Sequence, residues 1–112
     1  MKLGATAQLF KGLADRVRLR VLNAIAQTNE ITGTQLAGVL RLPRSTVARH
    51  LRYLYRSRLV TTRHSHGEAH YALRREAEAI HDKVTDIIIH DLPGIEGLTR
   101  DNHRLAALRR TR

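Results

Sequence analysis

Cysteine and tryptophan are absent from this chain of 112 residues, and phenylalanine occurs once. Without cysteine the chain has no disulfide, no thiolate metal site and no thiol-based redox sensor. Aromatic residues make up only 4% of the chain, so the core must consist of leucine, isoleucine, valine and alanine, which favours helices. A chain of this length fits one domain with a modest core, and association with a second copy would help to stabilise it.

Long hydrophobic runs are missing as well. No stretch approaches the length of a membrane span, and the N-terminus lacks the charged, apolar and small-residue order of a signal peptide. We therefore expect a cytoplasmic protein with no membrane contact. The sequence also contains no glycine-rich phosphate loop, no serine elbow and no His-Glu pair at metalloprotease spacing, so we predict that it is not an enzyme.

One part of the chain lacks acidic residues altogether. From Ile31 to Gly67 there are seven arginines and no aspartate or glutamate, whereas residues 72–96 hold six acidic and three basic residues. The formal net charge of +10 is therefore unevenly distributed along the chain. A local positive field of this kind is expected of a surface that binds a polyanion such as nucleic acid.

Within this basic part, residues 41–60 (RLPRSTVARHLRYLYRSRLV) place apolar and cationic side chains on opposite faces of a helix. Because proline is tolerated in the first turn of a helix, this helix is predicted to begin near Pro43 or Arg44. The face predicted to be buried consists of Val47, Leu51 and Leu54. The opposite stripe, which suits a DNA groove, consists of Ser45, Arg49, Arg52 and Arg56.

Four other segments have helical periodicity. Asp15 is predicted to cap the N-terminus of the second helix, and Thr32 with Gln35 fits a capping box at the start of the third. Pro93 is predicted to stop the last helix. The predicted helices besides the basic one are residues 1–13, the segment after Asp15 up to a polar stop at 27–30, residues 32–42 and residues 74–92.

A β-hairpin is predicted after the basic helix. Residues 59–64 and 69–73 have the composition and alternation of strands, and Gly67 lies in the turn between them. Two short helices, a turn and a hairpin predict a mainly α fold, a winged helix-turn-helix with about five helices and a two-stranded wing. We expect residues 1–93 to form the DNA-binding and dimerisation domain. Residues 94–112 are expected to be a basic tail, either a short helix or mobile.

Three blocks of the sequence resemble the ArsR/SmtB family of winged-helix transcriptional regulators. LFKGLADRVRLRVL at 9–22 resembles the passage from the first helix to the second, PRSTVARHLRYLYRSRLV at 43–60 the recognition helix, and HGEAHYAL at 66–73 the wing. The resemblance implies a homodimer joined by the first and last helices. It also implies an inverted-repeat operator in double-stranded DNA, bound as a repressor or an activator.

The chain departs from the resemblance where many relatives bind metal. Thr32 and Thr34 stand at the positions of their cysteines. Arg58 replaces the glycine that usually precedes the wing, so that either Arg58 adopts a left-handed conformation at a cost of about 1 kcal/mol or the basic helix ends differently. The ligand positions that the resemblance implies for the last helix are Arg75, Ala77, Ile88 and Asp91, of which only Asp91 could coordinate.

Seven histidines without cysteine favour nickel, cobalt or zinc over softer metals. The H-x-H-x3-H cluster around the wing consists of His64, His66 and His70. These three side chains could share a metal ion, or they could face phosphate and solvent. His81 of one copy could approach Asp91 of a second copy, in a metal site or an ordinary hydrogen bond. His50 borders the apolar face of the basic helix and is predicted to be packed.

The DNA-binding roles follow from position along the basic helix. Arginine can bridge the O6 and N7 atoms of guanine, and hydroxyl groups can donate or accept at base edges. A straight helix leaves the groove after a few turns, so its later arginines should hold phosphates. Base-edge candidates are Arg44, Ser45, Thr46 and Arg49, phosphate candidates are Arg52 and Arg56, and wing candidates are Arg63, His64 and His66. The alternative is a winged helix used for protein contact or for weakly specific nucleoid binding.

Overall fold

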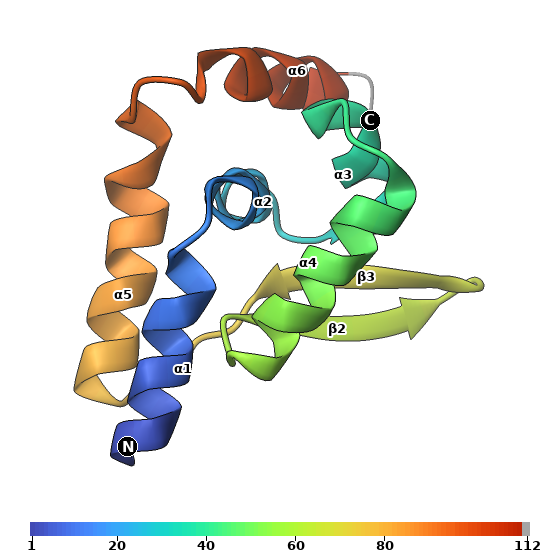
Figure 1. Ribbon diagram of the computed structural model, residues 1–112. Coiled ribbons are helices and arrows are strands. Elements are labelled where there is room, and N and C mark those ends of the chain that lie inside the picture. The colour runs from blue at the N-terminus through green and yellow to red at the C-terminus, as the bar shows by residue number, and fades with distance from the viewer. Residues whose placement is uncertain (111–112) are drawn as a thin grey trace.

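The computed structural model describes residues 1–110, and these residues form a winged helix-turn-helix (Figure 1). Across this range there are six α-helices and a sheet of three antiparallel strands. The helices are α1 Leu3–Leu13, α2 Arg16–Ala26, α3 Gly33–Leu40, α4 Arg44–Arg56, α5 Ala79–His90 and α6 Thr99–Arg110, with a 3-10 turn η1 at Leu92–Gly94. The strands are β1 Ile31–Thr32, β2 Val60–Ser65 and β3 Glu68–Leu73.

Helix α2 forms the centre of the core. Figure 1 shows it end-on, with α1, α5, α6, α3 and α4 around it. Val21, Leu22 and Ile25 are completely buried, as their apolar spacing predicts. The predicted N-cap is confirmed, because the Asp15 side chain accepts a hydrogen bond from the backbone N–H of Arg18 at 3.0 Å.

The turn between α3 and α4 is built from the residues that the sequence indicated. The capping box at the start of α3 is confirmed, with reciprocal bonds between Thr32 and Gln35 of 3.1 Å each. Helix α3 ends at Arg41, which has a left-handed conformation with φ of 57°. Pro43 then takes the N-cap position of α4, so the expected start of the basic helix is confirmed.

The wing is the hairpin β2–β3, and β3 also pairs with β1 in the order β1-β3-β2. A strand of only two residues carries no periodic signal, and for this reason the sequence did not reveal β1. His66 and Gly67 form the turn with φ of 51° and 76°, as a tight hairpin requires. Arg58 has φ of 63°, which confirms the left-handed alternative for the residue before the wing.

The last long helix begins later than predicted. Helix α5 begins at Ala79 and not at Arg74, because the backbone N–H of Arg74 bonds the carbonyl of Leu59 at 3.0 Å, and residues 74–78 form neither helix nor strand. Of the two alternatives for the C-terminal segment, the short helix is confirmed, because α6 begins at Thr99 and its Leu105 is completely buried. Within residues 1–110, no helix has the length and apolar character needed to cross a membrane.

Candidate nucleic-acid interface

Helix α4 separates its apolar and cationic faces as predicted. Val47, Leu51 and Leu54 are at most 2% exposed and pack in the core. The opposite face is open to solvent. Its arginines are Arg49, Arg52 and Arg56, and within residues 1–110 none of their side chains makes a hydrogen bond or an ion pair. Three unneutralised guanidinium groups on one rigid helix form a binding surface for an anionic partner.

The start of α4 offers both polar side chains and backbone donors. Ser45 is exposed and Thr46 is half-buried, and no side chain caps the helix because its N-cap is Pro43. The free N–H groups of the first turn and the positive end of the helix favour a phosphate or a base acceptor here. Arg44 differs from the expectation of a free base reader, since its Nη1 donates to Thr34 Oγ1 at 2.5 Å.

The wing divides its candidate residues between two faces. Arg63 makes a bidentate ion pair with Glu30, with nitrogen–oxygen distances of 2.8 and 2.6 Å. The Arg63 guanidinium lowers the pKa of the Glu30 carboxyl, and Glu30 in turn raises the pKa of Arg63. The free charge expected at Arg63 is therefore compensated. His66 lies exposed in the turn at the tip of the wing.

The predicted metal cluster is contradicted by the register of the hairpin. Arg63 pairs with His70, whereas His64 pairs with Ala69. Successive residues of a strand point to opposite faces, so His64 and His70 project to opposite sides of the wing. Across residues 1–110 no three His, Cys, Asp or Glu side chains come close enough together to hold a metal ion. The hypothesis of a shared His64, His66 and His70 site is therefore wrong for the single chain.

His64 and two arginines of α4 line the same groove. It has a volume of about 370 Å³ and runs between α4 and the wing. Cationic and aromatic side chains share this groove, which is the pattern of a nucleic-acid surface. The lining residues are Leu51, Arg52, Tyr55, Arg56, Thr62, His64 and Tyr71.

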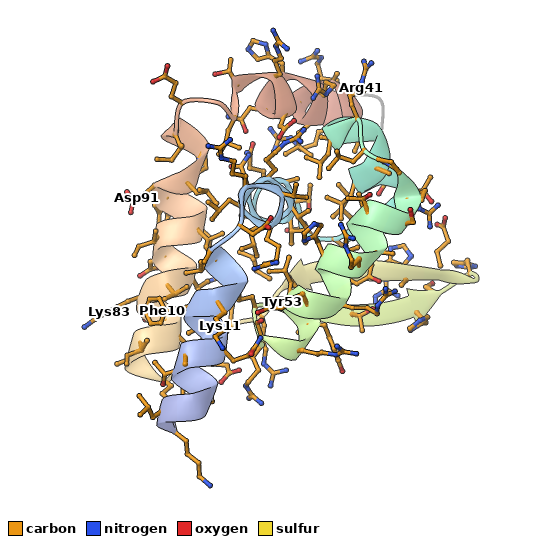
Figure 2. All side chains as sticks on the ribbon, in the orientation of Figure 1. Phe10, Lys11, Arg41, Tyr53, Lys83 and Asp91 are labelled. Carbon is orange, nitrogen blue, oxygen red and sulfur yellow. The ribbon has the colours of Figure 1, made fainter. Side chains whose placement is uncertain are left out.

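Helix α4 is held from behind by α1 and α2. The guanidinium of Arg18 lies 4.0 Å from the centre of the ring of Tyr53, which Figure 2 labels, and the two form a cation–π contact. The same group donates to the carbonyls of Lys11 and Gly12 at 2.8 and 3.1 Å. His50 is packed as predicted, and its burial lowers the pKa of the imidazole.

The corner between α4 and the wing is tied to α5. His81 is completely buried, and its Nε2 donates to the carbonyl oxygen of Arg58 at 2.7 Å. Glu76 accepts from the side chains of both Arg58 and Arg74, at 3.1 and 2.6 Å. The expectation that His81 faces Asp91 of a second copy is therefore wrong. Sequence reasoning missed the pairs Arg58–Glu76 and Arg63–Glu30, because their members are 18 and 33 residues apart and no local spacing links them.

Comparison with known proteins agrees with this geometry. Residues 15–62 match the family described as bacterial regulatory protein, arsR family. The transcriptional repressor PagR of Bacillus anthracis is 37% identical over 51 residues, which are 46% of this chain. This match spans 52% of PagR, so the chain matches about half the length of its curated relative.

Solved structures extend the similarity to most of the fold. HlyU from Vibrio cholerae N16961 superposes with a TM-score of 0.65 at 26% identity, covering 79% of this chain and 94% of HlyU. The crystal structure of PagR superposes with a TM-score of 0.64 at 29% identity, covering 77% of this chain and 91% of PagR. The antimony-specific transcriptional repressor AntR superposes with a TM-score of 0.60 at 25% identity, covering 75% of this chain and 73% of AntR. PagR and AntR are named as transcriptional repressors, which are not enzymes.

Proposed function

We propose that this chain, whose residues 15–62 match the arsR family of bacterial regulatory proteins, is a transcriptional regulator that reads double-stranded operator DNA with α4. The observation that carries the proposal is the stripe of three unpaired arginines on the solvent face of a helix whose other face is buried. A charged helix fixed by its apolar side keeps its orientation when it enters a major groove. Such a protein works where the DNA is, in the cytoplasm.

The reading end of α4 is its start. Ser45, Thr46 and Arg49 contact base edges, and Arg52 and Arg56 hold phosphates further along the helix. Arg44 also contacts a base edge. On binding, its guanidinium leaves the Thr34 hydroxyl and donates to guanine, because O6 and N7 together are a stronger acceptor than one hydroxyl. On the wing, His64 and His66 contact the DNA directly. Arg63 contacts it after its ion pair with Glu30 breaks.

We also propose a homodimer on an inverted repeat. Helices α1 and α5 lie on the same side of the molecule in Figure 1. Their outer faces expose apolar side chains that a single chain leaves uncovered. The most exposed are Leu3 at 86%, Phe10 at 50%, Ile80 at 43% and Ile87 at 55%. Burying them against a second copy places two α4 helices for half-sites about one helical turn of DNA apart.

The relatives named as repressors favour repression as the direction of control. The name of AntR gives antimony as its specificity, but the described part of this chain brings together no comparable set of ligands. A nickel, cobalt or zinc response through the wing is not part of the proposal, since His64 and His70 face opposite ways.

The test is a binding comparison on two duplexes at equal salt. An inverted repeat selected from a random library should bind at least about a thousandfold more tightly than random duplex of the same length. The logarithm of affinity should fall with the logarithm of salt by about 0.9 for each phosphate neutralised. Equal affinity for both duplexes with a steep salt slope would favour nucleoid binding, and a flat salt slope would favour protein contact.

A further inference from the structure

A second basic element lies outside the helix-turn-helix. We infer that α6 is a DNA-contacting helix. Two of its exposed arginines, Arg100 and Arg110, have no hydrogen-bond or ion-pair partner within residues 1–110, and they bind phosphates beside the bases read by the start of α4. This inference rests on the proposed function, because it needs DNA at the start of α4. It adds a contact surface that the helix-turn-helix and the wing do not contain.

Helix α6 is fixed against the end of α3 that leads into α4. Asp101 is only 3% exposed, and its two oxygens accept from Arg20 at 2.8 and 3.0 Å and from Arg104 at 2.9 Å. Arg20 also donates to the carbonyl of Leu40 at 2.6 Å, and Arg104 donates to the carbonyl of Val39. Both carbonyls belong to the last turn of α3. The position of α6 relative to the start of α4 is therefore set by charged hydrogen bonds, which are the strong ones.

The surface of α6 carries charge of one sign. Its single acidic residue is Asp101, which is buried and already paired with two arginines. Arg100 and Arg110 are exposed, and within residues 1–110 neither side chain makes a hydrogen bond or an ion pair. A helix of 12 residues is about 18 Å long, which matches roughly five phosphates at 3.4 Å along one strand. The exposed face of α6 thus offers cations over a length suited to a DNA backbone.

The basic surface continues from α6 to α4 through Arg41. This exposed residue lies in the turn, three positions before the first residue of α4. It lines a groove together with Arg104 and Ala107 of α6, and Figure 2 shows Arg41 beside the α6 end of the molecule. A duplex that engages the start of α4 therefore meets α6 on the same side of the turn. A phosphate backbone fits this surface, since it presents regularly spaced anions without requiring sequence recognition.

The test compares two double variants of the full chain. Arg100→Gln with Arg110→Gln removes two exposed charges of α6 and leaves Arg109, which donates to the carbonyl of Gln27 at 2.7 Å. Arg75→Gln with Lys11→Gln removes the same net charge from exposed positions elsewhere, and Figure 2 labels Lys11 on α1, away from Arg41 and α6. All four side chains are exposed, so thermal unfolding and the oligomeric state should match the wild type in both variants. The measurement is the slope of log affinity against log salt, on the selected operator and on random duplex.

The α6 variant should lower the slope by about 0.9 for each phosphate that it no longer binds, on both duplexes alike, while the control pair leaves the slope unchanged. An α6 variant whose slope equals that of the wild type or of the control pair would overturn the inference. If the wild type binds operator no better than random duplex, the proposed function fails. The slopes on random duplex then still decide whether α6 binds phosphates, because phosphate contacts do not depend on sequence.

Discussion

Helices α4 and α5 are similar in length and both are amphipathic, but α4 exposes charged side chains whereas α5 exposes apolar ones. In α4 the apolar face is fully used inside the chain, and arginines remain outside. In α5 the residues that face inward are His81, Val84, Thr85 and Ile88, while Ile80 and Ile87 remain outside beside aspartates. The same periodicity therefore serves two roles. What a helix leaves uncovered, charge or apolar area, indicates whether its partner is a polyanion or a second copy.

The largest effect is expected when the exposed apolar face of α5 is made polar, which tests whether that face binds a second copy. Ile80→Glu with Ile87→Glu should give a folded monomer, because both side chains are about half exposed and carry little of the core. The monomer should bind operator about a hundredfold or more weakly, since each half-site loses the effect of linkage. Sedimentation equilibrium and operator titration check this result.

A control for this variant is Ile88→Glu. Ile88 is 2% exposed and belongs to the core of its own chain, so a charge there should unfold the protein and not simply dissociate it. A wild-type protein that is monomeric at micromolar concentration would contradict the assignment of the α5 face to a second copy.

The two faces of α4 can be separated by stability and affinity. Leu54→Ala should lower the free energy of unfolding by about 2 to 5 kcal/mol, because Leu54 is completely buried. Arg52→Ala should change it by less than about 0.5 kcal/mol and should weaken DNA binding instead. Urea titration measures the first effect and operator titration the second. Similar losses of stability in both variants would mean that the arginine face is also structural.

A smaller effect distinguishes the residues of α4 that contact bases from those that bind phosphates. Arg44→Ala should cost about 1 to 3 kcal/mol on the operator and less on random duplex, because it lies in the first turn. Arg56→Ala should weaken both duplexes equally and lower the salt slope by about one per subunit. Salt titrations of each variant on both duplexes provide the measurement. The reverse pattern would show that the end of α4, and not its start, enters the groove.

The smallest expected effect concerns the histidine between the two faces of α4. Burial lowers the pKa of His50 below the ordinary value of 6.5, and the nearby Asp15 carboxylate opposes this shift only in part. The unfolded chain therefore binds this proton at a higher pH than the folded chain, so His50 makes the protein less stable as pH falls through 6.5. An imidazole titration followed by NMR should place the pKa of His50 below 6.5. A value at or above 6.5 would contradict the role assigned to burial.

Local signals in the sequence predicted most of the helix-turn-helix. The N-cap at Asp15, the capping box at Thr32, the start of α4 and the left-handed Arg58 each depend on a few neighbouring residues, and each is confirmed. The spacing of Val47, Leu51 and Leu54 likewise identified the buried face of α4.

Interactions between distant segments were not predictable in this way. The pairing of β1 with β3 joins residues as far apart in the chain as Ile31 and Tyr71, and no periodicity marks it. The Arg63–Glu30 pair and the bond between Arg44 and Thr34 depend on the same folding of distant segments. The start of α5 was predicted too early because Arg74 has a helical composition around it but a tertiary partner at Leu59. Charge alone also did not reveal that Asp101 would fix α6 in place.

Among the glycines of the chain, Gly12 has the least space for a side chain. A Cβ atom at this position would lie 2.5 Å from Leu59 Cδ1 and 3.0 Å from Ser57 Cβ, at the corner where α4 passes into the wing. Any larger residue would push the end of α1 away from that corner, because packed interiors leave no room for an added carbon. In the proposed dimer α1 lies at the contact between subunits, so such a displacement would alter the distance between the two α4 helices. We therefore expect that, in the proposed dimer, substitution of Gly12 changes the spacing of the half-sites that the two α4 helices can reach.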